Sequence, residues 1–110
     1  LERNGLRALL ASGQNLQADV LVAPHHGSGR SLLPEFYAAV APRLVLVSCG
    51  AENRYGYPAK SLVRVLREKN IRLLSTAASG RIQVTWDAGK TGATALPYTI
   101  ATHRQSGDVR

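Results

Sequence analysis

The 110-residue sequence lacks methionine altogether, has a single cysteine and contains no long apolar run. One cysteine excludes an internal disulfide, so the fold does not depend on the redox state of its compartment. Neither a signal-peptide pattern nor the roughly 20 consecutive apolar residues of a membrane-spanning helix occurs, and we expect this piece to be soluble. Because the sequence has no initiator methionine and opens within a helical pattern, "LERNGLRALL", we expect it to be part of a longer protein.

Acidic residues are also scarce, since 7 Asp and Glu stand against 14 Lys and Arg, for a formal charge of +7. A net positive field of this kind favours polyanionic partners such as nucleic acid or anionic lipid head groups. Ordinary solubility charge on an arginine-rich surface explains the same excess. Charge alone does not decide between these two interpretations.

Hydrophobic residues make up 45% of the sequence, enough for the core of one small domain. Apolar residues at helical spacing predict three helices, at 2–11, 31–41 and 58–70. Apolar and β-branched runs predict four strands, at 19–23, 44–48, 71–75 and 81–86. We expect the four strands to form one mixed sheet, with the second and third helices on one face. The expected fold class is therefore α/β.

Local signals predict where these elements begin and end. Ser31 is suited to cap the second helix, and Pro58 is suited to open the third. The "AASG" after the third strand is typical of a tight turn, which predicts a hairpin between the last two strands. Residues 88–110 differ in composition from the domain at 1–87, and they predict a loop, an edge strand at 98–103 and a disordered tail.

Two adjacent histidines, in "PHHGSG", come directly after the strand at 19–23. Ligands of α/β sheets bind beyond the carboxyl ends of the strands, so His25 and His26 stand where a site is expected. Imidazole is the commonest ligand of zinc and similar metals, but neighbouring side chains diverge, which favours one ligand and one substrate-contacting histidine. The glycines around Ser28 leave backbone amides that can face an anion. The alternative is a surface loop whose histidines have no functional role.

Three stretches in this order, "DVLVAPHHGSGRS", "FYAAVAPRLVLVSCGAENRYGYP" and "LREKNIRLLSTAASGRIQV", resemble the C-terminal part of the metallo-β-lactamase-like domain of ComEC-type competence proteins. The resemblance covers roughly residues 1–86. It implies the C-terminal half of an αββα sandwich, in a membrane protein that takes up single-stranded DNA during natural transformation of bacteria. It also implies a parent in the inner membrane, with this domain soluble and on the periplasmic side. Histidines and aspartates bind metal ions in that family, usually two, and its proposed activity is hydrolysis of DNA.

The resemblance further implies roles for residues of the histidine loop. His26 matches the last metal-binding histidine of the fold, for zinc or manganese, and His25 matches a neighbouring position. His25 is thus an alternative ligand or a catalytic contact to phosphate. Ser28 matches a turn that faces the substrate and is assigned with His25 to catalysis.

A second loop, at 53–58, is implied to approach the same edge. Within it, Asn53 and Tyr55 match the family pattern and are expected to contact nucleic acid. Arg54 in this loop and Arg30 beside the histidines are the expected contacts to phosphate. Where this chain has Tyr57 the family often has histidine, which weakens any role of the second loop in proton transfer.

The chain lacks the H-x-H-x-D-H motif and the bridging aspartate that the family's metal site needs. A catalytic metal takes three protein ligands or more, so we expect the chain alone to be inactive, with no tightly bound metal. The parent remains open to interpretation as a metal-dependent phosphodiesterase, as a basic module that guides DNA without catalysis, or as another hydrolase of this fold.

Three partners are expected. They are single-stranded DNA, the rest of the parent chain with its membrane channel, and a second copy of the chain. The second copy would bind the open apolar face of the sheet, unless the tail segment "ALPYTIATH" covers that face instead.

Overall fold

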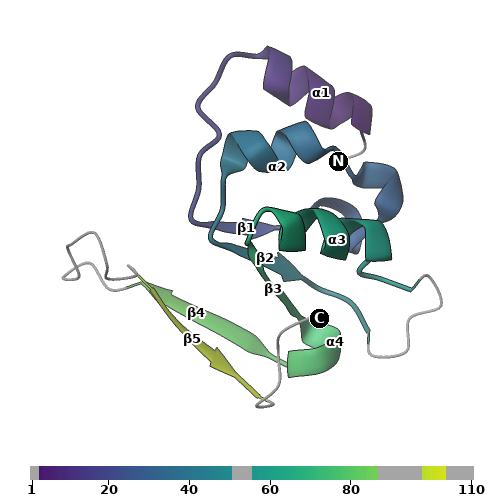
Figure 1. The fold of residues 1–110 in the computed structure, drawn as a ribbon. Coiled ribbons are helices and arrows are strands. Elements are labelled where there is room, and N and C mark those ends of the chain that lie inside the picture. The colour runs from purple at the N-terminus through teal and green to yellow at the C-terminus, as the bar shows by residue number, and fades with distance from the viewer. Residues whose placement is uncertain (1–2, 51–55, 87–97, 104–110) are drawn as a thin grey trace.

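The computed structural model describes residues 3–50, 56–86 and 98–103. Its helices are α1 (Arg3–Ala11), α2 (Pro34–Val40), α3 (Lys60–Glu68) and α4 (Thr76–Ser79), with two short 3-10 turns, η1 (Pro24–Gly27) and η2 (Gly29–Ser31). Its strands are β1 (Val20–Val22), β2 (Leu44–Val47), β3 (Arg72–Ser75), β4 (Ile82–Trp86) and β5 (Tyr98–Thr102). Figure 1 shows α2 and α3 on one face of the β1-β2-β3 sheet and the β4-β5 ribbon on the other.

The β1-β2-β3 sheet is parallel, with β2 in the centre, and its strands are apolar at nearly every position. Val45 stands opposite Leu21 on one side and Leu73 on the other. Because successive side chains of a strand point to opposite faces, Val45 and Val47 pack toward the helices, whereas Leu44 packs toward the β4-β5 ribbon. The expected α/β class is confirmed. The expected burial on both faces holds for the central strand β2 but is wrong for β1, which lies at an edge of the sheet and is only partly buried, with Val22 64% exposed.

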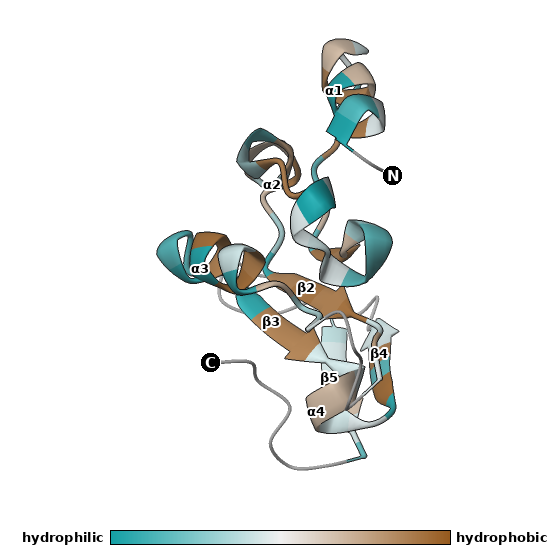
Figure 2. Cartoon of the chain, turned by 90° about the vertical axis from the view of Figure 1, so that its right-hand side faces the viewer, coloured by the Kyte–Doolittle hydropathy of each residue, from teal (hydrophilic) through white to brown (hydrophobic). Residues whose placement is uncertain are grey.

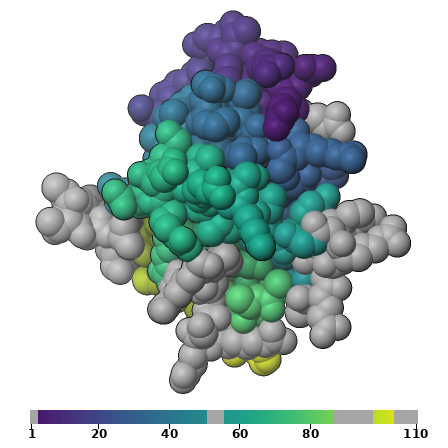
Figure 3. All heavy atoms as spheres, turned by 45° about the vertical axis from the view of Figure 1, so that its right-hand side comes forward, coloured from purple at the N-terminus to yellow at the C-terminus, as the bar shows by residue number. Residues whose placement is uncertain are grey.

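The helical layer buries one apolar stripe from each of its helices. Leu62 and Leu66 of α3 are 1% exposed, and Tyr37 of α2 is 2% exposed. Leu6 fixes α1 to the same core, and the space-filling view shows the purple α1, the blue α2 and the green α3 stacked in that order (Figure 3). Burial raises the pKa of Tyr37 to about 12, because the charged phenolate would lose its water. In Figure 2 hydrophilic residues alternate with hydrophobic ones along α3, as expected of a helix that covers a sheet.

The predicted single sheet of four strands is wrong, and so is the predicted hairpin between the last two strands. After β3 the chain forms the short helix α4, in which the Ser75 hydroxyl accepts the Ala77 N–H at 3.0 Å. Such a local side-chain bond favours a helical turn over a hairpin turn. The chain then leaves the parallel sheet, and β4 pairs with β5 in antiparallel register, Val84 opposite Ile100. Residues 98–102 are therefore the expected added strand, but in a second sheet.

This second sheet covers the apolar face that the sequence left open. Leu44 and Leu74 are 0% exposed beneath it, and Tyr98 is 4% exposed. Ile82 and Val84 of β4 pack against the same cluster. Of the two expected ways to cover this face, a second copy of the chain or the tail segment, the structure shows the tail segment.

Two helix starts also differ from expectation. The second helix begins at Pro34 after Leu33, while Ser31 belongs to η2, so Ser31 is not its cap. Proline fits the first helical position because its missing N–H has no partner there in any case. The third helix begins at Lys60, two residues after Pro58, and Asn70 ends it in the left-handed conformation, as expected. Among the described residues, no helix has the length and apolar character needed to cross a membrane.

Candidate functional site

The carboxyl ends of the three parallel strands meet at one edge of the sheet, and the polar residues of the candidate site follow them. His25 and His26 follow β1 in η1, and Ser48 with Cys49 follows β2. Thr76 follows β3 and connects the carboxyl end of β3 to that of β2. The Thr76 hydroxyl accepts the Cys49 N–H and donates to the Cys49 carbonyl, both at 2.9 Å. This reciprocal pair fixes the spacing of the edge on which the histidine loop lies.

The histidine loop has an uncommon backbone. His25 and His26 both lie in the left-handed region, with φ of 49° and 55°. Non-glycine residues adopt this region rarely, and consecutive residues do so less often still. The surrounding structure therefore has to hold the loop in place, and such strain gathers at functional sites.

Gly27 is one of the anchors of this loop. Its carbonyl accepts the Ala59 N–H at 2.9 Å, which ties the loop to the start of α3. Its φ is 79°, and a Cβ at this position would lie 3.1 Å from the Pro58 Cβ and 3.2 Å from Leu62 Cδ2. Only glycine satisfies both the backbone conformation and the close approach.

The second anchor is the side chain of His26, whose Nδ1 lies 2.7 Å from the Ser48 carbonyl oxygen. A carbonyl oxygen only accepts hydrogen bonds, so Nδ1 is the nitrogen that carries the proton. Nε2 of the neutral ring then keeps its lone pair. A backbone carbonyl on Nδ1–H is the usual arrangement around a histidine that ligates a metal through Nε2.

A pocket of about 670 Å³ opens at this edge. It is lined by His25, His26, Ser28, Gly29, Arg30, Tyr57 and Ala59. The sequence-predicted residues His25, His26, Ser28 and Arg30 are therefore brought together. Asn53, Arg54 and Tyr55, the other predicted contacts, lie outside the described residues.

Ser28 lies in the pocket wall with its side chain largely buried, at 5% exposure. Its hydroxyl accepts the Arg30 N–H at 3.1 Å and so caps η2. This bond orients the segment that carries Arg30, whose own side chain is exposed at the pocket. Ser28 thus has a structural contact in addition to the catalytic assignment that the sequence suggested.

Tyr57 belongs to the pocket although its sequence position suggested only a departure from a pattern. Its ring is nearly parallel to that of His26, with 17° between the planes and 6.4 Å between the centroids. The ring of His25 lies at the same centroid distance from Tyr57, tilted by 55°. The available signal was the position of Tyr57, directly before the proline that contacts the histidine loop.

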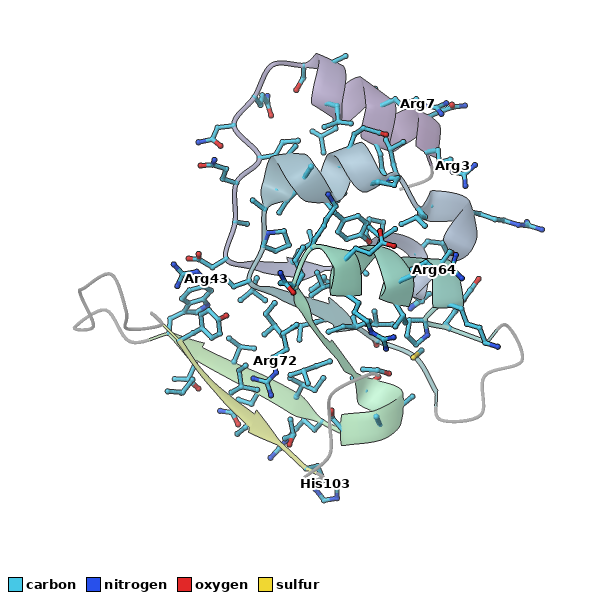
Figure 4. All side chains as sticks on the ribbon, in the orientation of Figure 1. Arg3, Arg7, Arg43, Arg64, Arg72 and His103 are labelled. Atoms are coloured by element: carbon cyan, nitrogen blue, oxygen red, sulfur yellow. The ribbon has the colours of Figure 1, made fainter. Side chains whose placement is uncertain are left out.

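Cys49 is the other residue of this edge that sequence reasoning passed over. Its Sγ lies 3.3 Å from Ser75 Oγ and 3.5 Å from the Tyr57 carbonyl oxygen, and the residue is partly buried. It therefore contributes to the scaffold behind the pocket. His103, the remaining histidine, lies beyond β5 on the two-stranded sheet (Figure 4).

The donor set does not fit a complete metal site. Within the ranges that the structure describes, no three His, Cys, Asp or Glu side chains lie close enough to hold one ion. His26 offers one oriented nitrogen and His25 a second imidazole, whereas a catalytic metal takes three protein ligands or more. Any metal at this edge needs further ligands from outside these residues.

Comparison with known proteins gives two relatives. The chain is 36% identical over 83 residues to ComE operon protein 3 of Bacillus subtilis (strain 168), covering 76% of this chain and 11% of that protein. It is 37% identical over 84 residues to competence protein ComA of Neisseria gonorrhoeae, covering 76% of this chain and 12% of that protein. The chain thus spans about a tenth of the length of these relatives. No family model matches it, and no solved structure matches it significantly.

Proposed function

Because this chain is related over three quarters of its length to competence proteins of the ComEC type, we propose that it forms the C-terminal part of a metallo-β-lactamase-like domain in a DNA-uptake protein. In this proposal the parent domain is a metal-dependent phosphodiesterase acting on DNA. The parent lies in the inner membrane, with this domain on the periplasmic side. The chain by itself is inactive because it supplies only part of the site.

The observation that carries this proposal is the hydrogen bond between His26 Nδ1 and the Ser48 carbonyl. A histidine without function has no need of a strained backbone and a fixed tautomer at the ligand-binding edge of the sheet. We assign His26 as one ligand of zinc or manganese, with the other ligands supplied by the rest of the parent. A metal there would activate water and neutralise charge on the phosphate.

The other residues of the pocket act on the substrate. The Arg30 guanidinium binds phosphate oxygens, for which its planar fork of donors is suited. His25 contacts phosphate or serves as a second ligand. Ser28 keeps the segment around Arg30 in place through its bond to the Arg30 N–H.

The layered fold supports the part of the proposal that assigns this chain to one half of an αββα sandwich. Two sheets face each other across Leu44, Leu74 and Tyr98, with helices outside the parallel sheet. The outer helices beyond the second sheet would come from the rest of the parent. Val22, 64% exposed at the end of β1, is available for contact with that part, or with a second copy of the chain.

Zinc titration with nitrogen-detected imidazole NMR tests the assignment. Zinc is expected to shift the Nε2 signal of His26 and to leave Nδ1 protonated, with weak affinity because the ligand set is incomplete. His103 is the internal control, and His26→Gln should abolish the effect. Equal shifts at His103, or a shift that begins at Nδ1 of His26, would contradict the assignment.

A second candidate is a basic module that guides single-stranded DNA without cleaving it. The positive charge of the chain favours this candidate. An experiment on the longer protein that carries this chain distinguishes the two candidates. His26→Ala should abolish DNA cleavage and spare binding if the domain is an enzyme, and should change neither if it only binds.

A further inference from the structure

Basic side chains come from three separate elements beside the histidine pocket, and one of them, Arg30, lines the pocket. These residues, called the basic rim here, are Arg3 and Arg7 of α1, Arg30 of η2, and Lys60 and Arg64 of α3. All of them are exposed. Figure 4 places the labelled Arg3, Arg7 and Arg64 on the same side of the molecule, at the end toward which β2 runs.

Hydrogen bonds connect the rim to the pocket. The Arg3 guanidinium donates to the Leu32 carbonyl at 3.0 Å and to the Gly29 carbonyl at 3.2 Å, which fixes the start of α1 on η2. Arg7 follows Arg3 by one helical turn and therefore lies on the same face of α1. The rim on this side is thus continuous with Gly29, a residue of the pocket wall.

The start of α3 closes the rim on the other side. Lys60 follows Ala59, which lines the pocket, and Arg64 lies one turn further along the same helix. A Cβ on Gly29 would lie 3.4 Å from Ser61 Oγ, so η2 and the first turn of α3 are in direct contact. Arg30 of η2 therefore stands between the cations of α1 and those of α3.

The rim has little opposing charge. Among the described side chains, Glu35 lies in the first turn of α2 and Glu68 lies one turn beyond Arg64 on α3, and no carboxylate lies within ion-pair distance of Arg7, Arg30 or Arg64. Arg43, by contrast, lies 4.0 Å from Asp19 at the amino end of the sheet. A group of cations without carboxylate partners attracts a polyanion more strongly than neutralised ion pairs do.

The pocket beside the rim presents flat rings. Tyr57 and His26 lie nearly parallel, and both line the pocket. Aromatic rings next to a cationic track are the usual means of binding unpaired bases, because every base has a face that stacks. A duplex does not expose such faces.

The same cations fit an anionic membrane surface less well. Helices that bind membranes combine a basic face with large apolar side chains that enter the lipid. The large apolar side chains most exposed in the described chain, Val22 and Trp86, lie on β1 and β4 and not on the rim. The ring pair in a concave pocket has no function against a flat surface.

We propose that the basic rim binds the phosphates of a single-stranded nucleic acid and that Tyr57 stacks an unpaired base at the mouth of the pocket. This inference rests on the proposed function, since it names how the substrate of that site is held. It assigns Arg7, Arg64, Lys60 and Tyr57 to a site for which sequence reasoning named other contacts.

Fluorescence anisotropy with labelled oligothymidine, in EDTA, tests the proposal independently of any metal at His26. The double variant Arg7→Gln, Arg30→Gln should weaken binding and reduce the slope of log affinity against log salt by about 1.4, at about 0.7 per lost phosphate contact. The control Arg43→Gln, Lys69→Gln loses the same charge at the amino end of the sheet and should change the slope far less. An equal change in both variants would overturn the rim as a defined site.

Tyr57→Leu tests the stacking step. It should weaken oligothymidine binding by about tenfold and leave duplex binding unchanged, while Tyr57→Phe should retain the affinity. Circular dichroism checks that each variant is folded. Equal losses for duplex and single strand, or binding to phosphatidylglycerol vesicles but not to oligothymidine, would overturn the proposal. The His26→Ala variant should lose zinc binding and retain oligothymidine binding. This result would show that the nucleic-acid site can be tested independently of the metal ligand.

Discussion

The two ends of the parallel sheet each carry left-handed residues and a pocket, yet for different reasons. At the amino end, Ala41 and Asn70 have φ of 48° and 57°, and both end a helix, where this conformation is ordinary. At the carboxyl end, His25 and His26 have similar angles but end no α-helix. The same backbone angle is thus a cap in one place and imposed strain in the other.

The charges of the two ends differ in the same way. The amino-end pocket, of about 410 Å³, holds Asp19 and Arg43 on opposite sides of an ion pair. The carboxyl-end pocket holds Arg30 with two imidazoles, and none of the described residues that line it carries a carboxylate. The arginine that lines the amino-end pocket is therefore paired with a carboxylate, whereas the Arg30 side chain at the carboxyl end is available to an anion.

The largest expected effect on stability comes from replacing Gly27, which anchors the histidine loop at the carboxyl end of the sheet. Gly27→Ala should destabilise the fold by about 2–4 kcal/mol, because alanine meets both a positive φ and Pro58. Gly13→Ala is the matched control: its φ is 73° with nothing within 4 Å, so the loss should be about 1 kcal/mol. Urea denaturation measures both. Equal losses would show that the close approach to Pro58 is not needed.

Next in size is an alkaline effect from Tyr37, whose carbonyl accepts the Ala41 N–H at the amino end. Burial raises its pKa from 10.0 to about 12, so the protonated form is favoured in the folded state. Its stabilising contribution is full below pH 10 and is lost as the pH rises through 12, by about 2–3 kcal/mol. Tyr37→Phe should flatten the stability profile in this window, and an unchanged profile would contradict the burial argument.

A pair of glycine substitutions compares the left-handed residues directly. Ala41→Gly should stabilise the fold by about 1 kcal/mol, since glycine removes the strain of the left-handed backbone at this helix cap without loss of a hydrogen bond. His26→Gly relieves a similar strain but loses the bond to Ser48, so it should give a change near zero. Thermal unfolding checks both, and a clear gain for His26→Gly would mean that the bond contributes nothing.

The smallest effect belongs to the ion pair of the amino end. Both side chains are about half exposed and their atoms are 4.0 Å apart, so Arg43→Gln should change stability by less than about 0.5 kcal/mol. Urea denaturation at low and high salt gives the measurement. A loss of stability comparable to that of Gly27→Ala would show that the ion pair at the amino end contributes substantially to the fold.

Much of the fold could be predicted from sequence because its signals are local. The apolar runs predicted the three parallel strands β1, β2 and β3, and helical spacing predicted α1 and α3 to within two residues. The partner of β4 could not be predicted, since it depends on the competition between a hairpin turn at Ser79–Gly80 and the Ser75 bond to Ala77. Strand pairing across a long connection leaves no local signal.

The sequence by itself determined that a histidine pair follows an apolar strand, that the chain is basic, and that its motifs match those of competence proteins. Only the tertiary structure decided which nitrogen of His26 is protonated, because Ser48 lies 22 residues away along the chain. It also brought Tyr57 beside His26 and placed cations of α1 and of α3 on the same side of the molecule. These contacts join segments that are distant in sequence, and their distances are set by packing at the edge of the sheet rather than by the residues alone.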